Sequence, residues 1–474
     1  MSFNQAVAPD RFPMLALTER LRSLNHDIAG DIVTADDPNW DSARQAWALA
    51  VDQRPAAVAL PQSPEDIVTI VNFARSHGLR VAPQGTGHNA HPLEDALTES
   101  ILVKTERMRR VEIDANARRA RVEAGAVWRD VTVPAAAHGL AALAGSSPDV
   151  GVVGYTLGGG HSWLGRRHGL ATNSVYAIEV VTADGRRRRA DRDHDPDLFW
   201  ALRGGGGSFG VVTAIEIELM PITHVFAGVL LFAQERAREV LQAWRAWTEQ
   251  ELPDEISSVG RVLNVPPLPD VPEPLRGRSF VVVEAIYIGD EAEGARLVAP
   301  LRELGPEIDT FAMIPAPALS QLHMDPEQPV AAKGDGMLLS ELPSEAVDAL
   351  VEAATGERGS ALLSVEVRQL GGAIARSAPE HGALAAIEAP YAMYAVGGTP
   401  TAESVAIVLG QVNGVKDALS PWSAPCGHLN FAERRLDSRA FYASEYTYRR
   451  LQAIKAQYDP SDVIQSNHPI RPAS

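Results

Sequence analysis

Three glycine-rich stretches carry the residues whose types and spacing suggest chemistry. They are residues 85–89 (G-T-G-H-N), 145–160 and 203–210. Glycine lets a backbone approach a flat or anionic ligand closely, and successive N–H groups in a turn converge on phosphate oxygens without basic side chains. One cluster would be typical of a structural turn, whereas three clusters at strand ends indicate a bound ligand. A histidine, His88, directly follows the first pair of glycines.

Two common nucleotide-binding motifs do not explain these stretches. Residues 205–210 spell G-x-G-x-x-G, but they run into a strand-like segment rather than a helix, and no acidic residue follows about 20 positions on. No cluster reads G-x-x-x-x-G-K-[ST]. An NAD-binding doubly wound domain and a P-loop are therefore both disfavoured.

Length and composition indicate a globular protein of two or three domains. Of the 474 residues, 45% are hydrophobic and 22% are charged. The net charge of −17 argues against nucleic acid or an anionic membrane surface as partner, and solubility explains it as well. The single cysteine, Cys426, excludes an intrachain disulfide and is expected to be an ordinary residue. With no signal-peptide pattern and no run of about 18 apolar residues, we expect a cytoplasmic protein without a membrane span.

Short strands and helices are expected to position the glycine-rich stretches. Ser63, Pro64 and the acids behind them predict a helix start, and Gly78 ends that helix. A strand over 79–82 then leads into residues 85–89. Residues 14–54 are expected to form two helical pieces around a polar loop. Further strands are predicted over 55–61, 101–103, 110–113 and 119–123, a helix over 127–138, and a hairpin over 175–190.

The pattern changes after Met220-Pro221, where the glycine clusters end. Strands over 280–289, 361–370 and 390–397 alternate with helices over 235–248, 344–354 and 402–419. A last helix is predicted over 444–458. The change indicates a second domain in the middle of the chain.

Five motifs, in order, resemble the berberine-bridge-enzyme-like branch of the vanillyl-alcohol-oxidase superfamily of flavoproteins. Residues 83–89 resemble the R-G-G-G-H-[NDS] loop of that family, 147–155 resemble C-P-T-V-G-x-x-G-[YLH], and 156–170 resemble T-x-G-G-G-x-G-x-[LM]-x-R-x-x-G-L. Residues 198–213 and 448–460 match nearly letter for letter. The resemblance is strong over 55–222 and 440–470 and weaker between them.

The resemblance implies an α+β, two-domain FAD-linked oxidase. Residues 1–222 would form a PCMH-type FAD-binding domain. Residues 223–438 would form a substrate domain, an antiparallel sheet backed by helices. Residues 439–474 would return to the FAD-binding domain and close over the flavin.

The resemblance also implies which residues hold FAD. The loop 85–89 would bind the pyrophosphate, and His88 matches the histidine that is bonded to the flavin 8α-methyl group. The other expected contacts share a place in one of the matching motifs: Gln84, Gly85, Thr86, Gly87, Asn89, Ser147, Pro148, Val150, Gly151, Gly154, Tyr155, Thr156, Gly158, Gly159, Gly160, Gly205, Gly206, Ser208, Gly210, Val212, Tyr448 and Asn467.

The positions where the sequence departs from the family motifs also bear on how FAD would be bound. Ser147 stands where many relatives attach the flavin a second time through cysteine, so we expect a single covalent link. His91 is a minor rival to His88 for that link, and His88 beside a noncovalent FAD is the alternative. Gln84 replaces a frequent basic residue. Val150 is either a small residue that admits oxygen to the flavin or simply a core valine.

The reacting residues are sought in the middle of the chain. Relatives use a tyrosine of a Y-x-N-[FY] motif as base, and His428 aligns with it here. A histidine suits proton abstraction at neutral pH, but His428 could also only shape the pocket, or the catalytic machinery could be lost. Ser364, Glu366 and Arg368 alternate with Val365 and Val367, so one strand face could present polar groups to the flavin. Tyr391 and Tyr394 are further candidates to line the pocket, although their odd separation puts one in and one out unless a bulge intervenes. His161 is expected to be a satisfied structural histidine.

These features predict an FAD-dependent oxidase that moves hydride from a small organic substrate (alcohol, sugar, alkaloid or polyketide) to flavin N5 and electrons on to O2. A dehydrogenase with another electron acceptor and a non-catalytic flavin-binding protein are the alternatives. We expect no metal, and the sequence predicts no oligomeric state.

Overall fold

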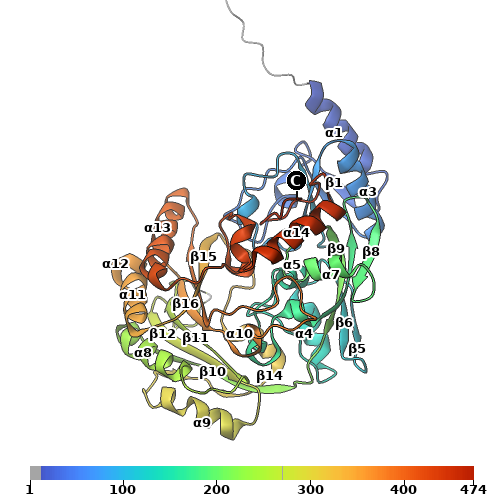
Figure 1. The fold of residues 1–474 in the computed structure, drawn as a ribbon. Coiled ribbons are helices and arrows are strands. Elements are labelled where there is room, and N and C mark those ends of the chain that lie inside the picture. Colours follow the sequence, from blue (N-terminus) through green and yellow to red (C-terminus); the bar gives the residue numbers. More distant parts are fainter. Residues whose placement is uncertain (1–11, 270, 474) are drawn as a thin grey trace, which may run out of the picture.

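The computed structural model describes residues 12–269 and 271–473 and contains three sheets (Figure 1). The first has the order β1-β2-β4-β3, with β1 antiparallel to β2 and the other neighbours parallel. Its strands are β1 (Asp31–Val33), β2 (Ala57–Leu60), β3 (Arg80–Gln84) and β4 (Ser100–Lys104). Helix α3 (Pro64–Ser76) connects β2 to β3 and buries Ile67, Ile70 and Val71 on this sheet. It begins as predicted, because the Ser63 hydroxyl accepts a hydrogen bond from the N–H of Asp66.

The expectation for residues 14–54 is wrong in one respect. Helices α1 (Phe12–Leu24) and α2 (Trp40–Ala43) are present, but the segment between them contains β1. Ile32 and Val33 are buried in this strand and pair with Ala59 and Val58 of β2. The pairing partner lies about 27 residues away along the chain, so tertiary pairing overrides a locally polar sequence.

The second sheet is antiparallel, with the order β5-β6-β9-β7-β8. A hydrophobic core separates it from short helices and from the C-terminal helix, whose Leu451 and Ile454 are buried in that core. The isolated bridge between Val81 and Ile464 ties the tail to the first sheet as well. The elements are β5 (Val111–Asp114), β6 (Arg119–Glu123), β7 (Val175–Val181), β8 (Arg187–Asp191), β9 (Val211–Glu218), α4 (Trp128–Ala136), α5 (Val152–Leu157), α6 (Gly165–His168), α7 (Pro196–Leu202) and α14 (Glu445–Tyr458).

The third sheet is the largest and is antiparallel throughout, with the order β13-β10-β12-β11-β16-β17-β15 and β14 beside β10. Helices cover its outer face (Figure 1). A core that includes Val, Leu and Trp side chains lies between the helices and the sheet. The strands are β10 (His224–Ala233), β11 (Ile256–Asn264), β12 (Ser279–Tyr287), β13 (Ile308–Asp309), β14 (Ala312–Pro315), β15 (Ala332–Leu339), β16 (Ser364–Gln369) and β17 (Tyr391–Gly398); the helices are α8 (Ala237–Thr248), α9 (Glu291–Arg302), α10 (Leu319–Leu322), α11 (Ser344–Ala354), α12 (Gly356–Gly359) and α13 (Ala402–Leu419).

The structure combines helices with sheets, and its largest sheet is antiparallel. This confirms the predicted α+β fold class. The inner face of the large sheet looks toward the glycine-rich stretches, and its outer face is closed by helices (Figure 1). Within the described residues, no helix is both long and apolar enough to cross a membrane.

Candidate functional site

The first glycine-rich loop leaves a row of backbone donors free. Strand β3 ends at Gln84, and the N–H groups of residues 85–89 form no hydrogen bond with any described residue. The carbonyls of Thr86 and Gly87 accept bonds from the N–H groups of Trp47 and Ala48, which fixes the loop from the other side. Gly87 has a φ of +82°, in the region that favours glycine. A turn with several unpaired N–H groups can bind an anion.

Buried side-chain atoms without partners surround the same loop. Gln84 Nε2, His88 Nε2 and Asn89 Oδ1 are buried and form no hydrogen bond. Each such group costs about 1–3 kcal/mol unless a partner is supplied. The loop therefore fits a large polar ligand such as FAD better than it fits a closed structural turn.

Four groups define the surroundings of the His88 ring. The indole of Trp47 stacks on it, with ring centroids 3.9 Å apart and planes inclined by 16°. The Thr86 hydroxyl lies 2.7 Å from His88 Nδ1. Asp149 Oδ1 lies 3.6 Å from His88 Nε2, just beyond hydrogen-bond length, and Ser147 donates to the same carboxylate oxygen at 2.6 Å.

The second glycine-rich stretch lies beside the first. A side chain on Gly151 would meet Thr86 Oγ1 at 3.6 Å, so the two loops are neighbours. Gly151 begins α5, Thr156 bonds back to the Val152 carbonyl inside that helix, and Gly154 opens onto free space. The carbonyls of Pro148 and Val150 accept bonds from the start of α4.

The end of α5 meets the segment that follows Cys426. The N–H of Gly160 donates to Asn430 Oδ1 at 3.0 Å, and Asn430 Nδ2 donates to the Tyr155 carbonyl at 3.0 Å. A side chain on Gly159 would lie 3.3 Å from His428 Cε1, and one on Gly158 would lie 3.1 Å from Asn430 Oδ1. The second stretch thus contacts the residues expected to react.

Residues of the third glycine-rich stretch mostly contact other parts of the protein. The Ser208 hydroxyl bonds to Ser466 Oγ and accepts from the N–H of Ile470. A side chain on Gly205 would lie 2.2 Å from the Ala201 carbonyl oxygen, and one on Gly210 would lie 2.5 Å from Val180 Cγ2. These two glycines therefore permit close packing, whereas Gly206 opens onto free space. Val212 is buried in β9 opposite Val180.

The two predicted residues of the C-terminal return face protein groups. The Tyr448 hydroxyl lies 3.2 Å from Ser438 Oγ, and its ring stacks near Tyr442. Asn467 Oδ1 accepts a bond from the N–H of His468. The side chains of both therefore stabilise the tail in this structure.

A buried charged network occupies the inner face of the large sheet. His323, at the end of α10, lies between two carboxylates, with Nδ1 2.5 Å from Glu284 and Nε2 2.6 Å from Glu366. Arg261 pairs with Glu284 at 2.6 Å and Arg368 pairs with Glu366 at 2.7 Å. Burial works to lower the pKa of His323, but Glu284 and Glu366 outweigh it and raise that pKa to about 9. Burial alone would raise the pKa of Glu366, but Arg368 and His323 hold it far below the usual range.

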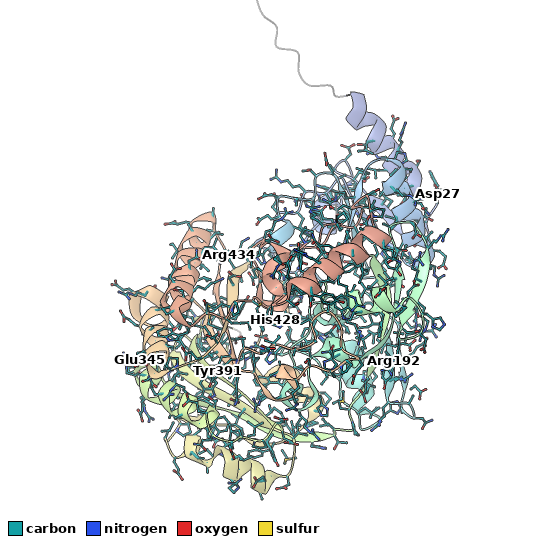
Figure 2. The ribbon with its side chains drawn as sticks, viewed as in Figure 1. Asp27, Arg192, Glu345, Tyr391, His428 and Arg434 are labelled. Carbon is teal, nitrogen blue, oxygen red and sulfur yellow. The ribbon has the colours of Figure 1, made fainter. Side chains whose placement is uncertain are left out.

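His428 lies near the centre of the molecule (Figure 2) and is 5% exposed. Neither of its ring nitrogens forms a hydrogen bond with a described residue. Its ring packs on Phe431 with centroids 5.3 Å apart, and the Arg368 guanidinium lies 5.1 Å from the centre of the same Phe431 ring. Burial, with a further contribution from Arg368, lowers the pKa of His428 to about 4. The imidazole is therefore neutral at pH 7 and can accept a proton.

The structure changes the expected roles of three neighbouring residues. Tyr391 does not reach this site, because it points into the helix layer, where its hydroxyl bonds to Thr248 and its ring packs on Trp244. Tyr394 lies on the inner face as the regular strand requires, but its hydroxyl donates to Glu433. Burial and Glu433 raise the pKa of Tyr394 well above its usual value, which disfavours it as a base. His161 is not satisfied, since its buried Nδ1 has no partner, and burial lowers its pKa well below the usual value.

Comparisons with known proteins support an FAD-binding enzyme. A family described as "FAD binding domain" matches residues 55–191, and one described as "Berberine and berberine like" matches residues 428–471. The chain is an FAD-linked oxidoreductase, and its residues 428–471 resemble berberine-like proteins. An uncharacterized FAD-linked oxidoreductase of Bacillus subtilis, YgaK, is 26% identical over 462 residues, which cover 94% of this chain and 97% of that protein.

Two further proteins are similar to this flavoenzyme, one in part of its sequence and one in its fold. The (R)-6-hydroxynicotine oxidase of Paenarthrobacter nicotinovorans is 34% identical over 208 residues, covering 44% of this chain and 45% of that enzyme. The structure of Physcomitrella patens BBE-like 1 superposes with a TM-score of 0.83 at 19% identity, covering 96% of this chain and 99% of that one. At that identity the second likeness establishes the fold.

The flavoenzyme has site residues that the motifs did not single out. Asp149 stands where the resembled motif has threonine, so the sequence alone could have singled it out. Trp47 and His323 gave no such signal, because each reaches its partner only through the fold. Within the described residues, no cluster of His, Cys, Asp or Glu fits a metal ion.

Proposed function

We propose that this flavoenzyme is an oxidase of a small organic molecule, with His428 as the base that takes a proton from the substrate. The observation that carries the proposal is the neutral, unpartnered His428 ring, placed where the second glycine-rich stretch meets the inner face of the large sheet. When bound, FAD supplies a two-electron acceptor for the substrate C–H bond and passes the electrons to dioxygen.

The chain's own residues would divide the work around that reaction. His428 would accept the proton of a substrate O–H or N–H at one of its two free nitrogens. Arg368 is held by Glu366, and its guanidinium lies 5.1 Å from the centre of the Phe431 ring, where it would orient a polar substrate group. The unpartnered His161 Nδ1 would contact the substrate from the FAD-binding side.

FAD would be held by the three glycine-rich stretches and tethered once, through His88. The free N–H groups of residues 85–89 support the pyrophosphate assignment. The Ser147 hydroxyl cannot form the second link that a cysteine forms, which supports a single tether. The expected domain limits, 1–222, 223–438 and 439–474, and a cytoplasmic location belong to this proposal.

Dioxygen as acceptor is favoured over another electron acceptor by Val150. This small, half-buried residue belongs to the loop of Ser147 and Asp149. The name of one relative, (R)-6-hydroxynicotine oxidase, agrees with an oxidase. Stopped-flow mixing of the reduced enzyme with dissolved oxygen tests this: fast reoxidation with peroxide release supports an oxidase. Slow reoxidation with rapid transfer to a quinone or dye would identify a dehydrogenase.

A non-catalytic flavin-binding protein remains the contrasting function, because His428 replaces the usual tyrosine. A panel of alkaloids, sugars, alcohols and phenols, assayed for flavin bleaching without oxygen, separates the two. Bleaching by any of them identifies an enzyme, whereas a flavin that no substrate reduces favours a binding role.

A further inference from the structure

Asp149 is a charged, buried group that the proposed reaction leaves without a role. It is 8% exposed, and it accepts bonds from two donors, Ser147 Oγ at 2.6 Å and Trp47 Nε1 at 2.6 Å. Burial works to raise the pKa of Asp149, but its interactions with His88, Ser147 and Trp47 lower it to about 2. The group is therefore a carboxylate at neutral pH.

The carboxylate is held beside one nitrogen of the His88 ring. Trp47 both stacks on the His88 ring at 3.9 Å and donates its N–H to Asp149, so a single side chain fixes the ring plane and the carboxylate together. Asp149 Oδ1 then lies 3.6 Å from His88 Nε2, which has no hydrogen-bond partner among the described residues. A small turn of the ring would close this gap to a hydrogen bond.

The two sides of the ring have different partners, and this fixes the tautomer. A carboxylate can only accept, so the nitrogen that faces Asp149 carries the proton. The opposite nitrogen, Nδ1, then keeps its lone pair, and the Thr86 hydroxyl lies 2.7 Å from it as a donor that can turn away. His88 is thus presented as a nucleophile at Nδ1.

We propose that Asp149 is the positioning residue for the covalent flavin link: it holds the proton on His88 Nε2, so that Nδ1 bonds to the flavin 8α-carbon. The inference rests on the proposed tether at His88. Both residues that flank Pro148, Ser147 and Asp149, depart from the resembled motif. The departures fit together, because a chain without the second tether depends on His88 alone.

The bond changes balance with dioxygen as oxidant. The Nδ1 lone pair forms the new N–C bond. The methyl C–H bond breaks, its proton leaves to solvent, and its electron pair stays on the flavin. Dioxygen then takes the two electrons, with that proton and one more from solvent, to give hydrogen peroxide. The alkylated ring of His88 keeps its Nε2 proton and becomes positive, and the adjacent carboxylate offsets that charge.

The test compares the purified holoenzyme with Asp149→Asn, Asp149→Glu and His88→Ala. Each protein is denatured in acid, the flavin absorbance of pellet and supernatant is read, and intact mass gives the flavinylated fraction. For Asp149→Asn we expect yellow native protein, with the covalent fraction lowered on the order of tenfold or more, the scale lost when a partner that orients a histidine is removed. Asp149→Glu should restore part of that fraction, because it keeps the carboxylate.

Every other outcome contradicts either the role of Asp149 or the tether at His88. If Asp149→Asn pellets as yellow as the wild type, the inference fails while the tether stands. If the wild type itself gives a colourless pellet, like His88→Ala, the tether in the proposed function fails instead. If Asp149→Asn folds but binds no FAD, Asp149 serves FAD binding rather than the link, which also overturns the inference. If it does not fold, Trp47→Phe keeps an aromatic ring beside His88 and removes the N–H donor, and an unchanged covalent fraction in that variant would count against the inference.

Discussion

The imidazole of His428 packs against the ring of Phe431, with centroids 5.3 Å apart and planes inclined by 63°. The contact holds the imidazole by its ring, not by its nitrogens, which remain unpartnered among the described residues. A base needs this arrangement, because a nitrogen already engaged with the protein could not take a proton from substrate.

Replacing His428 with Phe should slow flavin reduction by substrate by about 10²–10⁴-fold, the usual contribution of a general base. FAD content should not change, since His428 forms no hydrogen bond with the glycine-rich loops. Anaerobic stopped-flow with substrate measures the rate. His194→Phe is the matched control, because the His194 side chain is 74% exposed and pairs with Asp191. Equal reduction rates in wild type and His428→Phe would exclude the role.

The pH dependence of reduction should show the depressed pKa of His428. That pKa is lowered to about 4, so the base is free above pH 4 and protonated below it. The rate constant for reduction should be flat from about pH 5 to neutrality and should fall about tenfold per pH unit below pH 4. An inflection near 6.5, the value of an unperturbed histidine, would show that the ring is solvated during the reaction.

Replacing His88 with Ala should release the flavin on acid denaturation. The wild type should give a yellow pellet, and the variant a colourless pellet with free FAD in the supernatant. His91→Ala is the matched control, because His91 is the nearby rival and its ring faces Glu433 at 3.4 Å. A colourless His91→Ala pellet beside a yellow His88→Ala pellet would reassign the link.

Gly87→Ala should weaken FAD binding more than it weakens the fold. A side chain there would lie 2.8 Å from Gln84 Nε2 and 2.9 Å from Ala46 Cβ, and φ is +82°. Gly78→Ala is the control, since Gly78 has a φ of +69° but nothing within 4 Å. Both variants carry backbone strain of about 1–3 kcal/mol. Only Gly87→Ala should also lose FAD affinity, measured by fluorescence titration in a His88→Ala background, from which the untethered FAD can be removed. Equal affinities in both variants would mean that the loop does not contact FAD.

His323→Gln should destabilise the protein by about 1–3 kcal/mol, because the buried carboxylates of Glu284 and Glu366 each lose one charged partner and keep only Arg261 and Arg368. The folded-state pKa of about 9 is raised above the unfolded value, so this stabilisation is complete below pH 6.5 and is lost as pH rises through 9. Urea unfolding at several pH values measures both effects. His194→Gln removes an exposed pair with Asp191 and should cost less than 1 kcal/mol. A similar small loss for His323→Gln would show that the network is not holding a charge.

The sequence by itself determined the features that are local. The Ser63-Pro64 helix start, the glycine turns and the alternation of Glu366 and Arg368 with valines follow from backbone preference and strand period, which neighbouring residues decide. The order of the five motifs was enough to predict a flavin enzyme and its α+β fold. Even the outward turn of one of Tyr391 and Tyr394 follows from their spacing.

Only the tertiary structure decided which distant residues share an environment. Asp149 meets His88 and Trp47, which lie 61 and 102 residues away along the chain, because the loops before α5 and after β3 close on each other. His323 meets Glu284 and Glu366 because β11, β12 and β16 pair in a register that puts their charges on one face. Strand β1 forms inside a polar segment for the same reason. Such contacts depend on sheet register and loop packing, where a shift of one residue turns a side chain to the opposite face, and no short stretch of sequence specifies them.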